Sequence, residues 1–139
     1  MATFTKFNPF VEAVAEKVHN LGSDTLKVML TLTAPVAANA VKTDLTEITA
    51  GNGYTAGGNT VTITTSSQTA GLYSLIGSDV TFGPMTGSVG PLRYAVLYND
   101  TSASDNLIGF WDYGSSITLA SGDSLVVDFD QVNGILTLQ

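Results

Sequence analysis

The stretch Arg93–Gly114, RYAVLYNDTSASDNLIGFWDYG, decides the fold. It holds the only Trp of the chain and three of its five Tyr. Large apolar residues alternate with a period of two in 92–99 and again in 107–114, a pattern typical of strands. The small polar segment 100–106 separates the two runs. The stretch therefore predicts a β-hairpin.

The alternation assigns a face to each side chain of this hairpin. The faces of the first strand are Leu92, Tyr94, Val96 and Tyr98 against Arg93, Ala95, Leu97 and Asn99, and those of the second are Leu107, Gly109, Trp111 and Tyr113 against Ile108, Phe110 and Asp112. Apolar side chains on both faces indicate a central strand pair that is covered on both sides. Core packing is the favoured role of these aromatics, because aromatic residues of strands belong to cores more often than to ligand pockets.

The same period and the intervening turn signals predict further strands along the chain. They are 25–35, 59–65, 72–77, 79–83, 116–120, 124–129 and 134–138. In 25–35, Leu26, Val28, Leu30 and Leu32 are expected to form a single buried face. SGD (121–123) and VNG (132–134) are predicted hairpin turns, since Asn-Gly is a preferred type I′ pair. The Gly-rich segment 34–58 is predicted to be a loop-rich connection.

An amphipathic helix is predicted at 8–21. Asn8 occupies the N-cap position, Pro9 the first helical position, and Gly22 follows as a C′ residue. Helical spacing joins Phe10, Val11, Val14, Val18 and Leu21 into one apolar stripe. His19, in the last turn, is expected to have its charged form favoured by the helix dipole.

These elements predict a mainly β protein in which all 139 residues form one domain. The helix at 8–21 precedes an antiparallel β-sandwich or small jelly-roll-like barrel over 25–139, interrupted by the connection 34–58.

Charge limits the partners. The chain carries 5 basic and 12 acidic residues, with a net charge of −7. Such a chain is a poor ligand for phosphate backbones, so no nucleic-acid partner is expected. No apolar run reaches the roughly 20 residues of a membrane span, and no secretory signal is recognised at the start, so no membrane partner is expected either.

Motifs that carry chemistry are missing from the sequence. There is no Cys, and His19 is the only His, without a nucleophile elbow or a zinc-binding pattern around it. Asp128 and Asp130 lie in DFDQVNG, which resembles a calcium loop but has its Gly one place too late. No enzyme, catalytic residue, cofactor or metal is therefore predicted, and cation binding by these two aspartates stays open.

The N-terminal segment TFTKFNPF (3–10) places Phe4 and Phe7 before the helix. Two interpretations remain open. The two rings either dock on a neighbouring molecule or hold the helix against its own sheet.

Two long segments resemble small structural proteins of tailed-bacteriophage particles and related prophages. They are FNPFVEAVAEKVHNLGSDTLKVMLTLTAP (7–35) and SVGPLRYAVLYNDTSASDNLIGFWDYGSSITLASGDSLVVDFDQVNGILTL (88–138). A compact β chain of this size is similar to capsid decoration (cement) proteins. The resemblance implies a non-enzymatic protein, made in the host cytoplasm, that stabilises the outer surface of the capsid across neighbouring capsomers. It also implies that the protein binds the major capsid protein and assembles as a homo-oligomer, with a trimer favoured.

The candidate contacts with capsid or sister subunits are Phe4, Lys6, Phe7 and Lys17. The alternative is a tail, head–tail joining or fibre component, whose receptor-binding form would expose a sugar platform of Trp111, Tyr113 and Tyr98. A lectin-like or calcium-binding module is a further alternative.

Overall fold

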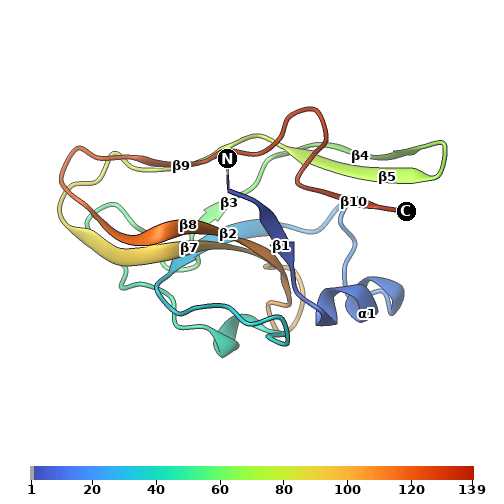
Figure 1. Ribbon diagram of the computed structural model, residues 1–139, viewed down its shortest axis with the longest axis horizontal. Coiled ribbons are helices and arrows are strands. Elements are labelled where there is room, and N and C mark those ends of the chain that lie inside the picture. The colour runs from blue at the N-terminus through green and yellow to red at the C-terminus, as the bar shows by residue number, and fades with distance from the viewer. Residues whose placement is uncertain (1) are drawn as a thin grey trace.

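The computed structural model of the chain describes residues 2–139 as an antiparallel β-sandwich with one short helix (Figure 1). In chain order the elements are β1 (Phe4–Lys6), α1 (Pro9–Ala15), β2 (Leu26–Thr31), the 3₁₀ helix η1 (Lys42–Asp44), β3 (Asn59–Thr60), β4 (Ile63–Thr69), β5 (Leu72–Gly77), β6 (Val80–Phe82), β7 (Val89–Asn99), β8 (Leu107–Leu119), β9 (Leu125–Val127) and β10 (Leu136–Leu138). The mainly β prediction is confirmed. Within residues 2–139 the strands do not close into a barrel.

Three sheets make up the sandwich. The five-stranded sheet has the order β1-β8-β7-β2-β3, and it faces a three-stranded sheet β10-β5-β4 and a two-stranded sheet β6-β9. In Figure 1 the two small sheets lie above the large one, with α1 and the 34–58 connection below it. The main core fills the space between the large and the small sheets, with side chains such as Val28 and Leu97 from one side and Leu75 and Phe129 from the other.

The predicted hairpin is β7–β8, the central strand pair of the large sheet. The predicted faces are wrong on both strands, because the register shifts between Leu92 and Tyr94 and again between Leu97 and Tyr98. Leu92 consequently faces the main core together with Leu97, and Trp111 shares that core with Ile108. A bulge adds one residue to a strand and reverses the alternation beyond it, which a pattern of period two does not reveal.

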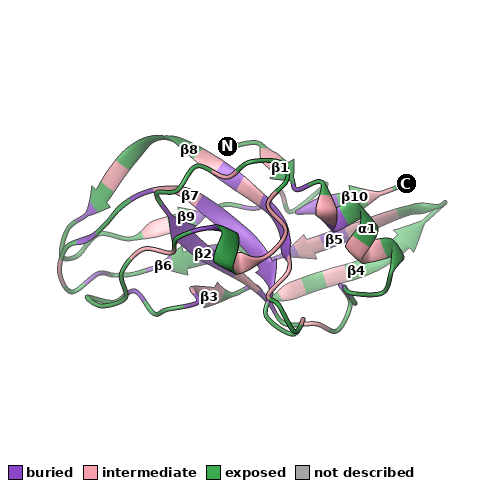
Figure 2. Ribbon diagram, turned by 90° about the horizontal axis from the view of Figure 1, so that it is seen from below, coloured by how far each residue is buried: buried purple, intermediate pink, exposed green. Residues whose placement is uncertain are grey.

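A second apolar cluster covers the opposite face of the large sheet. It contains Phe7, Met29, Leu45, Val96, Tyr98 and Leu107. The prediction that 25–35 has one buried face is therefore wrong: Met29 is completely buried on the far side, whereas Leu32 is exposed. Leu45 belongs to the connection 34–58, so this irregular segment forms a third layer over the sheet, as Figure 2 shows from below.

The helix is much shorter than predicted. It begins at Pro9, with Asn8 at the N-cap position, and it ends at Ala15 rather than at position 21. Lys17 adopts a left-handed backbone (φ 65°), which ends the helix before the expected Gly22. Phe10 and Leu21 are buried and Val14 packs against the main core, but Val11 and Val18 are exposed, so the five predicted positions do not form one buried stripe.

Other boundaries differ where strands change partner. The predicted strand 59–65 is divided into β3, which pairs with β2, and β4, which pairs with β5, so the chain passes from one sheet to the other at this point. The predicted strands 107–114 and 116–120 form one continuous strand, β8.

The predicted hairpin turns at 121–123 and 132–134 are also wrong. β9 pairs with β6 and β10 with β5, so neither turn joins two neighbouring strands. Asn133 does not have the positive φ that a type I′ turn requires. The two-residue hairpin turn is instead Ala70-Gly71 between β4 and β5, where both residues have positive φ.

Candidate functional site

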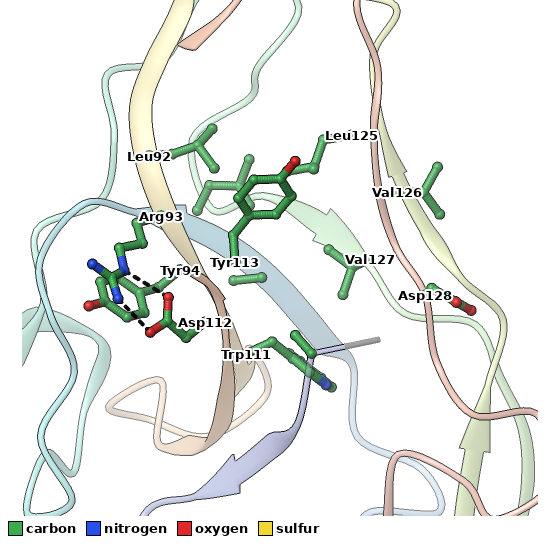
Figure 3. Close-up of a pocket in the computed structure, with 13 residues that line it drawn as sticks. Leu92, Arg93, Tyr94, Trp111, Asp112, Tyr113, Leu125, Val126, Val127 and Asp128 are labelled. Carbon is green, nitrogen blue, oxygen red and sulfur yellow. Dashed lines mark hydrogen bonds and ion pairs between the residues drawn. The ribbon is translucent and has the colours of Figure 1, made fainter. Parts of the chain in front are cut away.

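An open cleft of about 480 Å³ lies between the β7–β8 hairpin and β9 (Figure 3). Leu92 and Trp111 line it from the hairpin, and Val127 lines it from β9. Tyr113 and Val126 stand at its rim, with 58% and 51% of their surface exposed. The cleft therefore has an apolar interior and an exposed aromatic edge, which suits binding of a ring or an apolar side chain.

The pattern of strand pairing explains why a cleft is left between the hairpin and β9. β1 pairs with β8 only as far as Trp111, and β9 pairs only with β6. Beyond Trp111, β8 bulges, because Asp112 pairs with Tyr94 but the next partner of β7 is Ile117. The cleft depends on contacts between strands far apart in the chain, so sequence patterns did not indicate it.

An ion pair closes one side of the cleft. Arg93 donates from Nε to Asp112 Oδ1 at 2.8 Å and from Nη2 to Oδ2 at 2.9 Å. These hydrogen bonds from Arg93, with one from the Gly114 N–H, hold the pKa of Asp112 below its usual range. The guanidinium also lies 5.3 Å from the centre of the Tyr94 ring. The charges on this wall neutralise each other, whereas the exposed Asp128 beside the cleft forms no ion pair within the described residues.

The predicted sugar platform is only partly assembled. Trp111 and Tyr113 both line the cleft, but Tyr98 is completely buried in the second cluster, on the other face of the sheet. The Tyr98 hydroxyl donates to the Gly57 carbonyl at 2.7 Å, and burial raises the pKa of Tyr98 well above its usual range. Most aromatics of the hairpin thus pack in cores, and Tyr113 is the exception.

The four candidate contact residues lie in different environments. Phe7 is completely buried in the second cluster, so its ring holds the N-terminal segment against its own sheet and is not available at the surface. Phe4 is half-buried, and its ring lies 5.0 Å from that of Trp111. Lys6 and Lys17 are exposed.

Lys6 and Lys17 are also the two basic side chains without an ion pair among residues 2–139. Lys27 pairs with Asp100 at 3.0 Å, Lys42 with Glu47 at 3.4 Å, and Arg93 with Asp112. Lys6 lines a groove of about 370 Å³ beside β10, and Lys17 lines one of about 470 Å³ beside α1. Leu138 lines both grooves, so the groove of Lys6 and the groove of Lys17 adjoin at this residue.

Asp128 and Asp130, the two aspartates of the calcium-like sequence, lie in different surroundings. β9 ends before Asp128, and Phe129 between them is buried. The Asp130 carboxylate accepts hydrogen bonds from the N–H groups of Val132 and Asn133 and from the Asn133 side chain, each at 2.8 Å. These bonds hold the pKa of Asp130 below its usual range. Within residues 2–139 no three acidic or His side chains converge as a metal site.

His19 is buried, which the sequence did not indicate. Its Nδ1 accepts from Asn99 Nδ2 at 3.1 Å, and its Nε2 is buried with no partner among the described residues. Burial lowers the pKa of His19 below 6.5, and the nearby Asp24 only partly opposes this effect. The expected stabilisation of the charged form by the helix dipole is wrong, because the helix ends four residues earlier and burial dominates.

Comparisons with known proteins assign no family. A scan against protein-family models gave no match, and neither did searches of curated proteins and of solved structures. No helix among residues 2–139 is long and apolar enough to cross a membrane.

Proposed function

We propose that the protein is a non-enzymatic structural component of a tailed-phage particle that decorates the capsid. It stabilises the head by binding the major capsid protein across neighbouring capsomers on the outer surface. The proposal combines the resemblance of 7–35 and 88–138 with one structural observation. Among residues 2–139, Lys6 and Lys17 are exposed basic side chains without an ion pair, and they line two grooves that have Leu138 in common, in a chain of net charge −7.

The arrangement of charge supports a docking role for this surface. An acidic protein is repelled by an acidic partner unless its few free cations face that partner. Only 12% of the residues are charged, so a wide contact can form with little charge to desolvate. Association of several copies, for which the resemblance implies a trimer, would add avidity for a repeating capsid lattice.

Co-sedimentation with empty expanded capsids tests the proposal. We expect binding that saturates at a fixed ratio to the major capsid protein. Lys6→Glu/Lys17→Glu should weaken binding and reduce its dependence on salt, whereas Ser115→Glu/Ser121→Glu, exposed in and after β8, should bind as the wild type does. Absence of binding to intact heads would refute capsid decoration.

The second candidate is a tail, head–tail joining or fibre component with a receptor-binding role. The cleft favours this candidate, because Tyr113 is exposed at its rim and Trp111 lines its interior. A glycan that enters the cleft should change the fluorescence of Trp111, the only Trp, and Tyr113→Ala should abolish that change. The wild type should then bind phage tails or host glycans but not heads.

A further inference from the structure

The edge strands of this protein differ in length. β1, β3, β6, β9 and β10 each contain three residues or fewer, whereas β4 contains seven. Within residues 2–139, β4 pairs only with β5, and its other edge has no strand beside it. In Figures 1 and 2 the β4–β5 hairpin extends past the rest of the chain, with β4 on the outside.

β4 also lacks the features that usually protect an exposed edge. Its sequence, ITTSSQT, contains no charged residue and no Pro, and its only irregularity is a register shift between Ile63 and Thr65. Natural edge strands are commonly blocked by Lys, by Pro, by bulges or by being very short. The regular part, from Thr65 to Thr69, is left open for pairing.

Free backbone groups can be assigned from the hairpin register. The two-residue turn Ala70-Gly71 makes Thr69 and Leu72 the pair that closes the ladder. Because alternate residues of an antiparallel strand bond to the same neighbour, Ser67 and Thr69 direct their N–H and C=O groups to β5. Ser66 and Gln68 direct theirs away from the sheet, ready to pair with another strand.

The distribution of charged residues indicates which partner fits the free edge of β4. Residues 48–78 contain no Asp, Glu, Lys or Arg, although the whole chain has a net charge of −7. Two copies of so acidic a protein repel each other at most approaches, but the β4–β5 hairpin lets them meet without opposing like charges. The Thr and Ser side chains of two β4 strands can also hydrogen-bond across the new strand pair.

We propose that β4 pairs antiparallel with β4 of a second copy of this chain. The contact is isologous, so the same residues meet about a two-fold axis, and it joins the two three-stranded sheets into one continuous sheet. This inference does not rest on the proposed capsid role. It predicts a dimer, which sedimentation distinguishes from the trimer that the resemblance implies.

Sedimentation of charge variants tests the pairing. Ser67 lies near the middle of β4 and is exposed. Ser67→Lys and Ser67→Glu should each raise the dissociation constant of the wild-type dimer by about tenfold or more, because like charges then meet across the axis. An equimolar mixture of the two variants should associate again, since each dimer then pairs Lys with Glu. Ser115→Lys, exposed on the other sheet, is the matched control and should sediment like the wild type.

A cross-link provides an independent measurement. The chain has no Cys, so Ser67→Cys introduces one thiol per copy. Mild oxidation should give a disulfide-linked dimer with Ser67→Cys but not with Ser115→Cys, because only strands paired in register bring the two thiols within bonding distance. A monomeric wild type at every concentration, or an oligomer that keeps its affinity in both charged variants, would overturn the proposal.

Discussion

Trp111 of β8 stacks on Phe129, which follows β9, with ring centroids 5.2 Å apart and an angle of 30° between the planes. This contact joins the large sheet to the segment after the two-stranded sheet. Phe129 is almost completely buried. Phe129→Ala should therefore lower the free energy of unfolding by about 3–5 kcal/mol, through lost burial and the cavity that remains.

The fluorescence of Trp111 reports this contact directly, because the chain has no other Trp. Its native emission should shift to longer wavelength in Phe129→Ala before any denaturant is added. Val132→Ala, at an 83% exposed position three residues later, should change neither the emission nor the stability. Equal emission spectra for Phe129→Ala and the wild type would contradict the packing.

Tyr54 links the segment 34–58 to β2 through hydrogen bonds of its hydroxyl group. Its hydroxyl donates to Glu47 Oε1 at 2.7 Å and accepts from the Leu30 N–H at 3.1 Å, and burial raises its pKa well above the usual range. Tyr54→Phe should cost about 1–3 kcal/mol of stability, because it leaves the buried Leu30 N–H without a partner. Tyr113→Phe, at the exposed rim, is the control and should be neutral in urea unfolding.

His19 should make stability depend on pH. Burial lowers its folded-state pKa below 6.5, so the unfolded chain binds more protons as the pH falls through that value. The free energy of unfolding should therefore decrease from about pH 7.5 to pH 5.5, by at most about 1.4 kcal/mol per pH unit for this one group.

The hydrogen bonds around His19 add to the effect of burial. A proton on Nδ1 would face the Asn99 amide, whose Oδ1 is already held by the N–H groups of Thr101 and Ser102. The amide therefore cannot turn to accept that proton without losing both bonds. His19→Gln should remove much of the pH dependence in urea unfolding, and a pKa above 6.5 in an NMR titration would contradict the prediction.

The β4–β5 turn contains a correctable strain. Ala70 has φ 51° in the first position of a type I′ turn, a conformation that Asn adopts more readily than Ala. Ala70→Asn should stabilise the protein by about 1 kcal/mol, measured as a higher denaturation midpoint. Ala120→Asn, outside the left-handed region, should bring no such gain.

Local pattern predicted much of this fold. The period of two located β5 to the residue and identified the β7–β8 hairpin, because side-chain alternation in a sheet is a local property. It failed at Leu92, where a bulge reverses the faces, and at Asn133-Gly134, where a favourable turn pair does not join neighbouring strands.

The candidate sites depended more on tertiary structure. Lys6 and Lys17 could be named from the sequence as exposed cations, but only the pairing of the other three basic residues distinguishes them. The burial of His19 and the cleft beside Tyr113 result from contacts between segments that are far apart in the sequence but adjacent in the fold. No periodicity in one segment contains that information.

The connection 34–58 covers Met29 and Tyr98 although most of it has no regular secondary structure. Individual hydrogen bonds hold it in place. For example, the Gly57 N–H donates to the Glu47 carboxylate at 2.6 Å, and the Tyr98 hydroxyl donates to the Gly57 carbonyl. Mutational tolerance in this protein should therefore not follow the usual division between loops and strands. Glu47 and Gly57 should accept fewer substitutions than the solvent-facing residues of β4. The choice of residues in this irregular segment is then as restricted as it is in a hydrophobic core.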